Sequence, residues 1–165
     1  MTGIVKSPYT INHDAAFRGM VADGELANII SKLNTDVATI PFGTAVFRDA
    51  ANDNGAKMPT SVSTAEQFVG VAVRELNRAY PDASAFGGVV GMDFSVITTG
   101  VIYVKVLEAV KAGDAAYARV GSTGTGDFCK SAGSAATLSV VIPGAKFVSS
   151  ASAGALAKLS LVVGG

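Results

Sequence analysis

Hydrophobic and polar residues alternate most clearly over residues 93–106, on both sides of the dipeptide Thr99-Gly100. Each side is a run of β-branched and aromatic residues, which is typical of a β-strand. The glycine at the break can adopt a positive φ, as a tight turn between two strands requires. We therefore predict a β-hairpin that turns at Thr99-Gly100 and forms the centre of the fold.

The two faces of the second arm of this hairpin differ in character. Successive side chains of a strand point to opposite faces, so a purely aliphatic set lies on one face and is predicted to enter the core. That set is Ile102, Val104 and Val106. The opposite face is mixed and is expected to meet solvent or a partner protein. Its residues are Val101, Tyr103 and Lys105.

Residues 1–36 lack this alternation, and we interpret them as an N-terminal arm. Within the arm, apolar residues recur at the spacing of one helix face, which predicts a short helix over residues 24–33 with Asp23 as its N-cap. The β-branched pair Ile29-Ile30 also suits an extended arm that lies across another subunit. The residues of the predicted apolar face are Leu26, Ile29, Ile30 and Leu33.

From Thr39 to the C-terminus the chain consists of short β runs punctuated by glycine. Many short strands with turn signals between them predict a mainly β fold, a small β-barrel or sandwich of short antiparallel strands over residues 37–165. Asn54-Gly55 is a turn signal within a predicted polar loop, residues 49–57. The other expected strands are residues 40–48, 68–74, 115–120, 128–130 and 137–142, with a closing hairpin-like pair, residues 143–148 and 155–162.

Glycine-led segments recur in the two halves of this β region. The segments 42–46, 69–73 and 99–103 are echoed, in the same order, by 112–117, 143–147 and 153–157. An internal duplication would produce this echo, and so would chance in any glycine-punctuated β protein. Both interpretations stay open on the sequence alone.

The composition indicates one domain with much apolar surface to cover. A chain of 165 residues is long enough to bury a core without disulfides or metals. Hydrophobic residues make up 49% and charged residues 16%, and the mean hydropathy is +0.41. No apolar run approaches the roughly 18 residues of a membrane helix. The apolar excess therefore fills a core, or part of it lies on a surface that another protein covers.

The charge balance and the cysteine content exclude several classes of function. Lys plus Arg equal Asp plus Glu at 13 each, without a basic cluster, so we expect no direct nucleic-acid ligand. The single cysteine, Cys129, can form neither an internal disulfide nor a thiolate metal cluster. No apolar segment of a secretion signal follows Lys6, so we expect synthesis in a cytoplasm. We also expect no insertion into a membrane.

The residues with catalytic potential do not form a recognisable constellation. His13, the only histidine, lies in the arm rather than in the β region, so a nucleophile–histidine pair would have to draw on that arm. Cys129 follows a phenylalanine in a strand-like run, where a small buried thiol is expected. No pair among Asp82, Asp93 and Glu108 has a local spacing suited to acid–base catalysis. We therefore predict that the protein is not an enzyme.

Two loops resemble ligand-binding motifs only superficially. The glycine-rich turn over residues 121–127 lacks the Gly-Lys-Ser/Thr ending of a phosphate-binding loop, which favours a hairpin loop. The acidic and amide residues before Gly55 have the wrong spacing for a calcium loop, so we expect a solvated loop, with a weak surface cation site as the alternative. Those residues are Asp49, Asn52, Asp53 and Asn54. We accordingly predict no cofactor and no metal.

A series of short motifs, in this order, resembles the structural cement proteins of tailed bacteriophages, and the lead-in over residues 17–23 is similar to the arm that precedes their barrel. The motifs are Ile40-Pro41-Phe42-Gly43, Val69-Gly70-Val71-Ala72, Thr99-Gly100-Val101-Ile102-Tyr103-Val104, Ala112-Gly113-Asp114 with Tyr117, Thr123-Gly124, and Pro143-Gly144-Ala145 with Gly154. The resemblance implies a β-barrel decoration subunit on the outer capsid surface of the virion, which clamps neighbouring major capsid subunits. It also implies a homo-oligomer.

On this hypothesis two groups of residues are candidates for contact with the capsid protein. Ile29, Ile30 and Leu33 come from the arm, and Val101, Tyr103 and Lys105 come from the mixed face. Deleting residues 1–36 is expected to abolish binding and to leave a folded β domain. The alternatives are another virion component, such as a head-to-tail or tail part, and a non-catalytic surface-binding β module.

Overall fold

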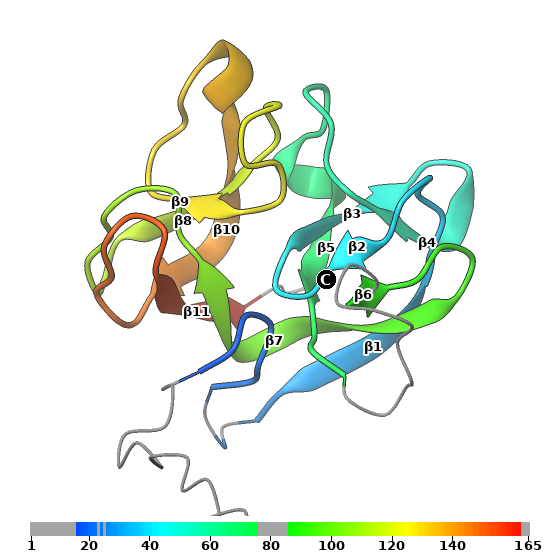
Figure 1. Ribbon diagram of the computed structural model, residues 1–165, viewed down its shortest axis with the longest axis horizontal. Coiled ribbons are helices and arrows are strands. Elements are labelled where there is room, and N and C mark those ends of the chain that lie inside the picture. Colours follow the sequence, from blue (N-terminus) through cyan, green and yellow to red (C-terminus); the bar gives the residue numbers. More distant parts are fainter. Residues whose placement is uncertain (1–15, 23, 25, 76–85, 163–165) are drawn as a thin grey trace, which may run out of the picture.

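The structure, a computed structural model, describes residues 16–22, 24, 26–75 and 86–162. In these residues, strands connected by loops make up most of the molecule, with two short 3-10 helices, η1 (Ala65–Gln67) and η3 (Ala135–Thr137) (Figure 1). The prediction of a mainly β fold is confirmed. The strands are β1 (Asn28–Asn34), β2 (Ile40–Pro41), β3 (Ala45–Asp49), β4 (Asn52–Lys57), β5 (Phe68–Ala72), β6 (Gly87–Gly88), β7 (Asp93–Lys105), β8 (Ala115–Arg119), β9 (Phe128–Cys129), β10 (Ser139–Phe147) and β11 (Leu156–Val162).

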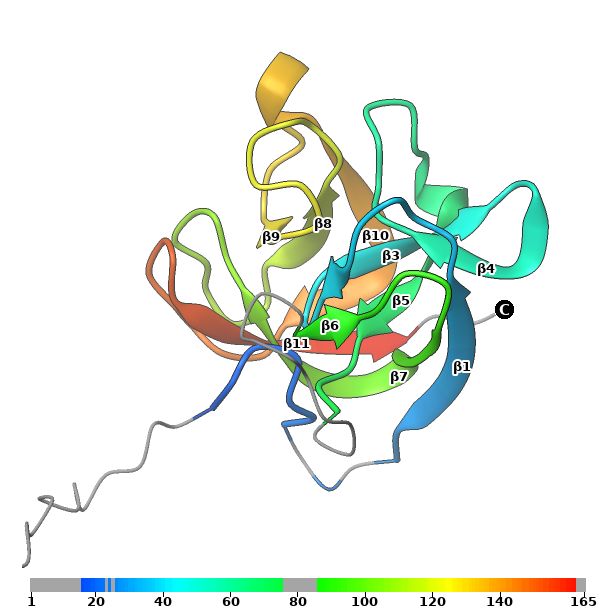
Figure 2. The same ribbon diagram turned by 45° about the vertical axis from the view of Figure 1, so that its right-hand side comes forward.

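Nine of these strands form one sheet that closes on itself around β7. Their order is β1-β4-β3-β5-β7-β11-β10-β8-β9, and a further pairing of β1 with β7 closes the first five into a ring. On the other side, a bridge between Val106 and Phe128 links β9 back to the end of β7. Two ring-like halves therefore share β7, which runs beneath both of them (Figures 1 and 2). The short strands β2 and β6 form a separate pair.

The predicted central hairpin is wrong, because β7 is one continuous strand of 13 residues. The N-terminal half of β7 pairs with β1 and β5, and its C-terminal half pairs with β11. Gly100 has a φ of +127° but lies within the strand, opposite Leu161. The apparent turn is a bulge: Asn28 pairs with Thr99 and Ile29 with Ile97, so Thr98 is an extra residue on β7.

This bulge explains how one strand serves two cores. One extra residue in a strand moves every following side chain to the opposite face. Before the bulge, Val96 packs in a small core within the first ring, whereas Ile97 packs in the larger main core. After the bulge, the even-numbered residues face the main core, and the prediction that they are buried is confirmed. Ile102, Val104 and Val106 each have 0% of their surface exposed.

The predicted helix over residues 24–33 is also wrong, because residues 28–34 form strand β1. Six consecutive residues of β1, from Asn28 to Leu33, pair with β7, and this tertiary pairing overrides the helical spacing of the apolar residues. The Asn28 side-chain amide also donates to the Thr98 hydroxyl at 2.8 Å, at the position of the bulge. The sheet therefore begins inside the segment that the sequence assigned to the arm. Asp23, the predicted N-cap, lies outside the described residues.

The lead-in before β1, residues 16–22, is attached to the same edge of β7. Its backbone forms hydrogen bonds with β7 from Gly19 to the Tyr103 carbonyl at 2.8 Å and from Ala22 to the Val101 carbonyl at 2.8 Å. Because Gly19 and Gly43 touch, a Cβ on Gly19 would lie 2.7 Å from the Gly43 nitrogen. The lead-in thus continues the β1 edge toward the C-terminal end of β7.

Two loop predictions also change in the structure. The chain turns at Ala50 and Ala51, and residues 52–57 form strand β4 instead of a loop. Gly55 serves close packing rather than a turn, because a Cβ there would lie 2.9 Å from the Thr35 methyl group. The predicted separate runs 137–142 and 143–148 are largely one strand, β10, with a register shift after Val141.

Candidate functional site

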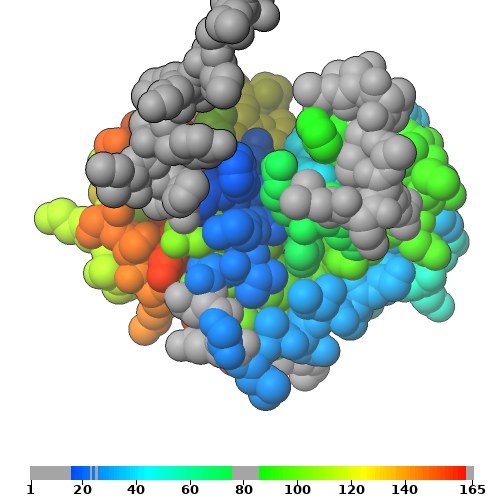
Figure 3. Space-filling view, turned by 60° about the horizontal axis from the view of Figure 1, so that its bottom comes forward, coloured from blue at the N-terminus to red at the C-terminus, as the bar shows by residue number. Residues whose placement is uncertain are grey.

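The residues of β1 form an exposed surface along one side of the molecule. Ile29 is 45% exposed, and the side chains of Ile30 and Leu33 are half-buried. Figure 3 shows this strand, in light blue, along the lower edge of the face turned forward. In the described part of the chain, only Leu33 and Asn34 of β1 pair with β4. The outer edge of residues 28–32 therefore has no strand partner there.

The other candidate group, on β7, is only partly accessible. Val101 is 4% exposed, so its side chain offers almost no surface to a partner. Tyr103 is half-buried, and the Lys158 ammonium lies 5.8 Å from the centroid of its ring. The Lys105 ammonium is 3.4 Å from a carboxylate oxygen of Asp127, which also pairs with Arg18 of the lead-in. Tyr103 with Lys158, and the Lys105 side chain, which is 42% exposed, are thus the accessible part of this face.

The candidate residues do not form a single cluster. Ile29, Ile30 and Leu33 lie beside the N-terminal half of β7, whereas Tyr103 and Lys105 lie on its C-terminal half. Val90 and Met92, which the sequence did not suggest, are 46% and 51% exposed at the C-terminal end of β1. There the Asn34 amide donates to the Met92 carbonyl at 3.0 Å. The signal for them in the sequence was an apolar run next to Gly91.

Two of the residues with catalytic potential, Cys129 and Glu108, make contacts within the chain. Cys129 is fully buried and its thiol lies 3.1 Å from the Ser139 hydroxyl. A Glu108 carboxylate oxygen accepts hydrogen bonds from the Lys130 amide at 2.7 Å and the Ser131 hydroxyl at 2.8 Å. The described residues contain no group of three or more histidine, cysteine or acidic side chains suited to a metal ion. Asp82 and His13 lie outside them.

The described residues also contain no helix that is long and apolar enough to cross a membrane.

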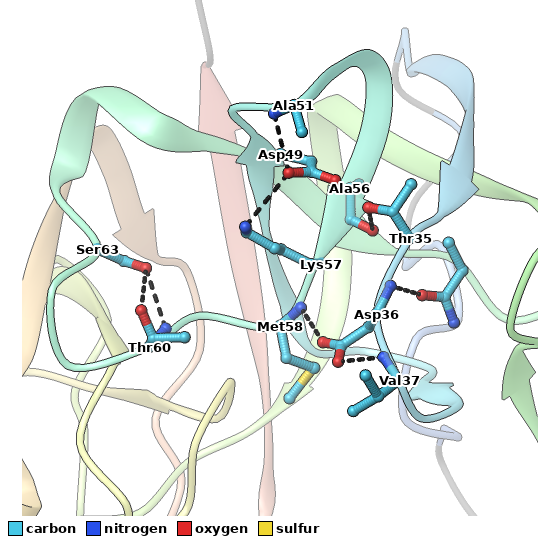
Figure 4. Close-up of polar contacts among 11 residues, drawn as sticks. Thr35, Asp36, Val37, Asp49, Ala51, Ala56, Lys57, Met58, Thr60 and Ser63 are labelled. Carbon is cyan, nitrogen blue, oxygen red and sulfur yellow. Dashed lines mark hydrogen bonds and ion pairs between the residues drawn. The ribbon is translucent and has the colours of Figure 1, made fainter.

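Asp49, one residue of the alternative cation site at the β3–β4 turn, contacts other groups of the chain (Figure 4). One carboxylate oxygen of Asp49 accepts the Ala51 amide at 3.1 Å and lies 3.3 Å from the Lys57 ammonium. The Thr35 hydroxyl, the Ala51 amide and Lys57 together hold the pKa of Asp49 below its ordinary value of 3.8, against a smaller opposing effect of burial. These groups of the chain therefore stabilise the carboxylate in its charged form.

Asp49→Asn is expected to lower stability at neutral pH, and the difference from the wild type should disappear as the pH falls well below 3.8. A lowered pKa in the folded state stabilises the protein above the pKa of the unfolded state, and this contribution is lost on acidification. Urea midpoints at several pH values measure it. Asp53→Asn, at an exposed position of β4, is the control. A difference for Asp49→Asn that persists unchanged in acid would contradict the assignment.

Comparison with known proteins identifies the family of the chain. A structural search finds similarity to a chain of the solved structure "The capsid of Myoviridae Phage XM1", with a TM-score of 0.72 and 17% identity over 93% of this chain and 94% of that chain. This likeness concerns the fold. No curated protein matches the sequence. The family described as "Structural cement protein (E217 gp24/Pam3 gp6)" matches residues 4–162. The chain therefore belongs to the phage structural cement proteins, as its motifs predicted.

Proposed function

We propose that this capsid cement protein binds the outer surface of a phage head and stabilises the contacts between neighbouring major capsid subunits. The observation that carries the proposal is the family match over residues 4–162. The protein acts there as a homo-oligomer and without catalysis. A structural role agrees with the described polar groups, such as Asp127, Glu108 and Asp49, which are engaged in contacts within the chain.

The β1 surface suits contact with a capsid subunit for two physical reasons. Ile29 and the half-buried Leu33 provide apolar area, whose burial stabilises an interface by roughly 25 cal/mol per Å² before the costs of association. Ile30 contributes little, because it packs against the small core. The open outer edge of residues 28–32 can add an extended strand of a partner through backbone hydrogen bonds. Small gains at each contact add up because a shell contains many equivalent joints.

Ile29→Asp is expected to raise the concentration needed for half-occupancy of undecorated heads by about tenfold or more, the usual effect of losing an anchor residue in an interface. The substitution places a charge in the proposed contact, and the fold should tolerate it because Ile29 is 45% exposed. Co-sedimentation of purified protein with undecorated heads measures the occupancy.

Val148→Asp is the matched control, because Val148 is 47% exposed but follows β10 in the other half of the molecule. It should bind heads as the wild type does. If Ile29→Asp binds heads as well as Val148→Asp and the wild type do, β1 is not part of the interface. A wild-type protein that binds no head at all would overturn the proposed function itself.

A further inference from the structure

Three segments that are distant in the sequence meet at the surface beside the lead-in and enclose one arginine. The guanidinium carbon of Arg74 lies 4.8 Å from the ring centroid of Phe17 and 5.7 Å from that of Phe86. The Arg74 amide donates to the Gly19 carbonyl at 2.7 Å, which holds the lead-in against the end of β5. Phe17 is 51% exposed and Phe86 is 39% exposed. The blue lead-in and the green residues after β5 are neighbours on the surface in Figure 3.

The charge of Arg74 is not neutralised by the described part of the chain. The ion pairs found there are those of Arg18 and Lys105 with Asp127 and of Lys57 with Asp49. The acid next to Arg74 in the sequence, Glu75, accepts the Ser95 amide at 3.1 Å. Both rings lie within cation–π distance of the guanidinium, whose planar edge carries its N–H donors.

Such an edge is suited to a carboxylate. A guanidinium offers two parallel N–H donors, which match the two oxygens of a carboxylate, and aromatic neighbours exclude water from its faces. Arginine and aromatic residues are also enriched among the residues that dominate binding at protein interfaces. A nucleic-acid backbone would require further free cations, but the nearby Arg18 is already paired with Asp127.

We infer that Arg74, held between Phe17 and Phe86, binds an aspartate or glutamate side chain of the major capsid subunit. The inference rests on the proposed capsid-binding function and adds the chemistry of one contact. The site lies beside the lead-in, apart from the exposed β1 edge, so one copy of the protein would touch the shell at two places.

The test compares head binding by full-length wild type, Arg74→Gln, Arg74→Lys and Arg48→Gln. Arg48, an exposed residue of β3, is the matched control for the loss of one positive charge. Arg74→Gln should raise the half-occupancy concentration by about tenfold or more, whereas Arg48→Gln should leave it unchanged. Arg74→Lys should be intermediate, because it keeps the charge and loses the paired donors. The difference in half-occupancy concentration between the wild type and Arg74→Gln should become smaller at high salt.

A second variant, Phe86→Leu, tests the role of the rings. It keeps apolar bulk but removes one aromatic face, and we expect binding to weaken about two- to fivefold. The thermal midpoint and the oligomeric size of each variant are measured alongside.

Unchanged binding by Arg74→Gln, or an equal loss in Arg48→Gln, would overturn the inference while the wild type still decorates heads. A change in oligomeric size on mutation of Arg74 would overturn it too, since the carboxylate would then belong to a second copy of this chain. A wild type that binds no head would overturn both proposals.

Discussion

Phe128→Ala is expected to lower the free energy of unfolding by about 3–5 kcal/mol, as is typical when a large aromatic side chain is removed from a core. Phe128 is fully buried in the main core. Its carbonyl also accepts the Leu107 amide at 2.8 Å, next to the bridge that closes the second ring. The loss combines a cavity with a weaker closure of that ring. Urea denaturation followed by circular dichroism measures it.

Phe128→Leu is the control for this prediction, because it keeps most of the apolar volume. Phe128→Leu should lower the free energy of unfolding by less than half as much as Phe128→Ala does. A loss below about 1 kcal/mol for Phe128→Ala, within the range of ordinary surface substitutions, would show that this side of the main core is not closely packed.

A chain that begins at residue 37 is expected to lose cooperative unfolding altogether. The deletion removes β1, which pairs with β7 along six residues and closes the first ring through β4. It also exposes one side of β7, where Val96 and Ile97 are fully buried in the intact protein. This reverses the expectation from the sequence that a folded β domain would remain. Calorimetry and near-ultraviolet circular dichroism measure the loss of packing.

A chain that begins at residue 16 is the matched comparison, because it keeps every described residue. It should unfold in a single transition close to that of the full chain. If the chain that begins at residue 37 also unfolds cooperatively at the same midpoint, β1 is dispensable for the fold.

The sequence predicted local features of the fold better than its strand pairing. The alternation of Ile102, Val104 and Val106 is a property of one strand, and its buried face is confirmed. The hairpin was wrong because Gly100 can lie within a continuous strand as readily as in a turn, and the choice depends on partners in β1 and β11. Those partners are distant in the sequence, so no local pattern reports them.

The candidate site shows the same limit. Ile29 was selected from the apolar spacing of a predicted helix and from a β-branched pair that suits an extended arm; the helix is absent, and the side chain is exposed on strand β1. Val101 was placed on an accessible face, but it is buried where the lead-in binds β7. Arg74 was not selected at all, because the two rings that enclose it come from residues 17 and 86.

The glycine-led echo in the sequence has a counterpart in the topology. Its first three segments lead into or lie in β3, β5 and β7, and its last three lead into or lie in β8, β10 and β11. Each set of three strands pairs in the same order, β3-β5-β7 and β8-β10-β11. The duplication therefore stays a hypothesis, and the two sets of three strands are the parts of the structure to compare in testing it.

The shared strand β7 also determines how the molecule would carry a mechanical load. A pull that separates the two halves along β7 would be transmitted by the covalent chain of that strand. Relative sliding of β7 and β11 would strain all the registered pairs from Leu156–Lys105 to Val162–Thr99 together. A ladder loaded in this shearing direction must lose its hydrogen bonds together rather than one at a time. If the subunit bridges two capsid subunits as proposed, β7 would carry the load between its two halves.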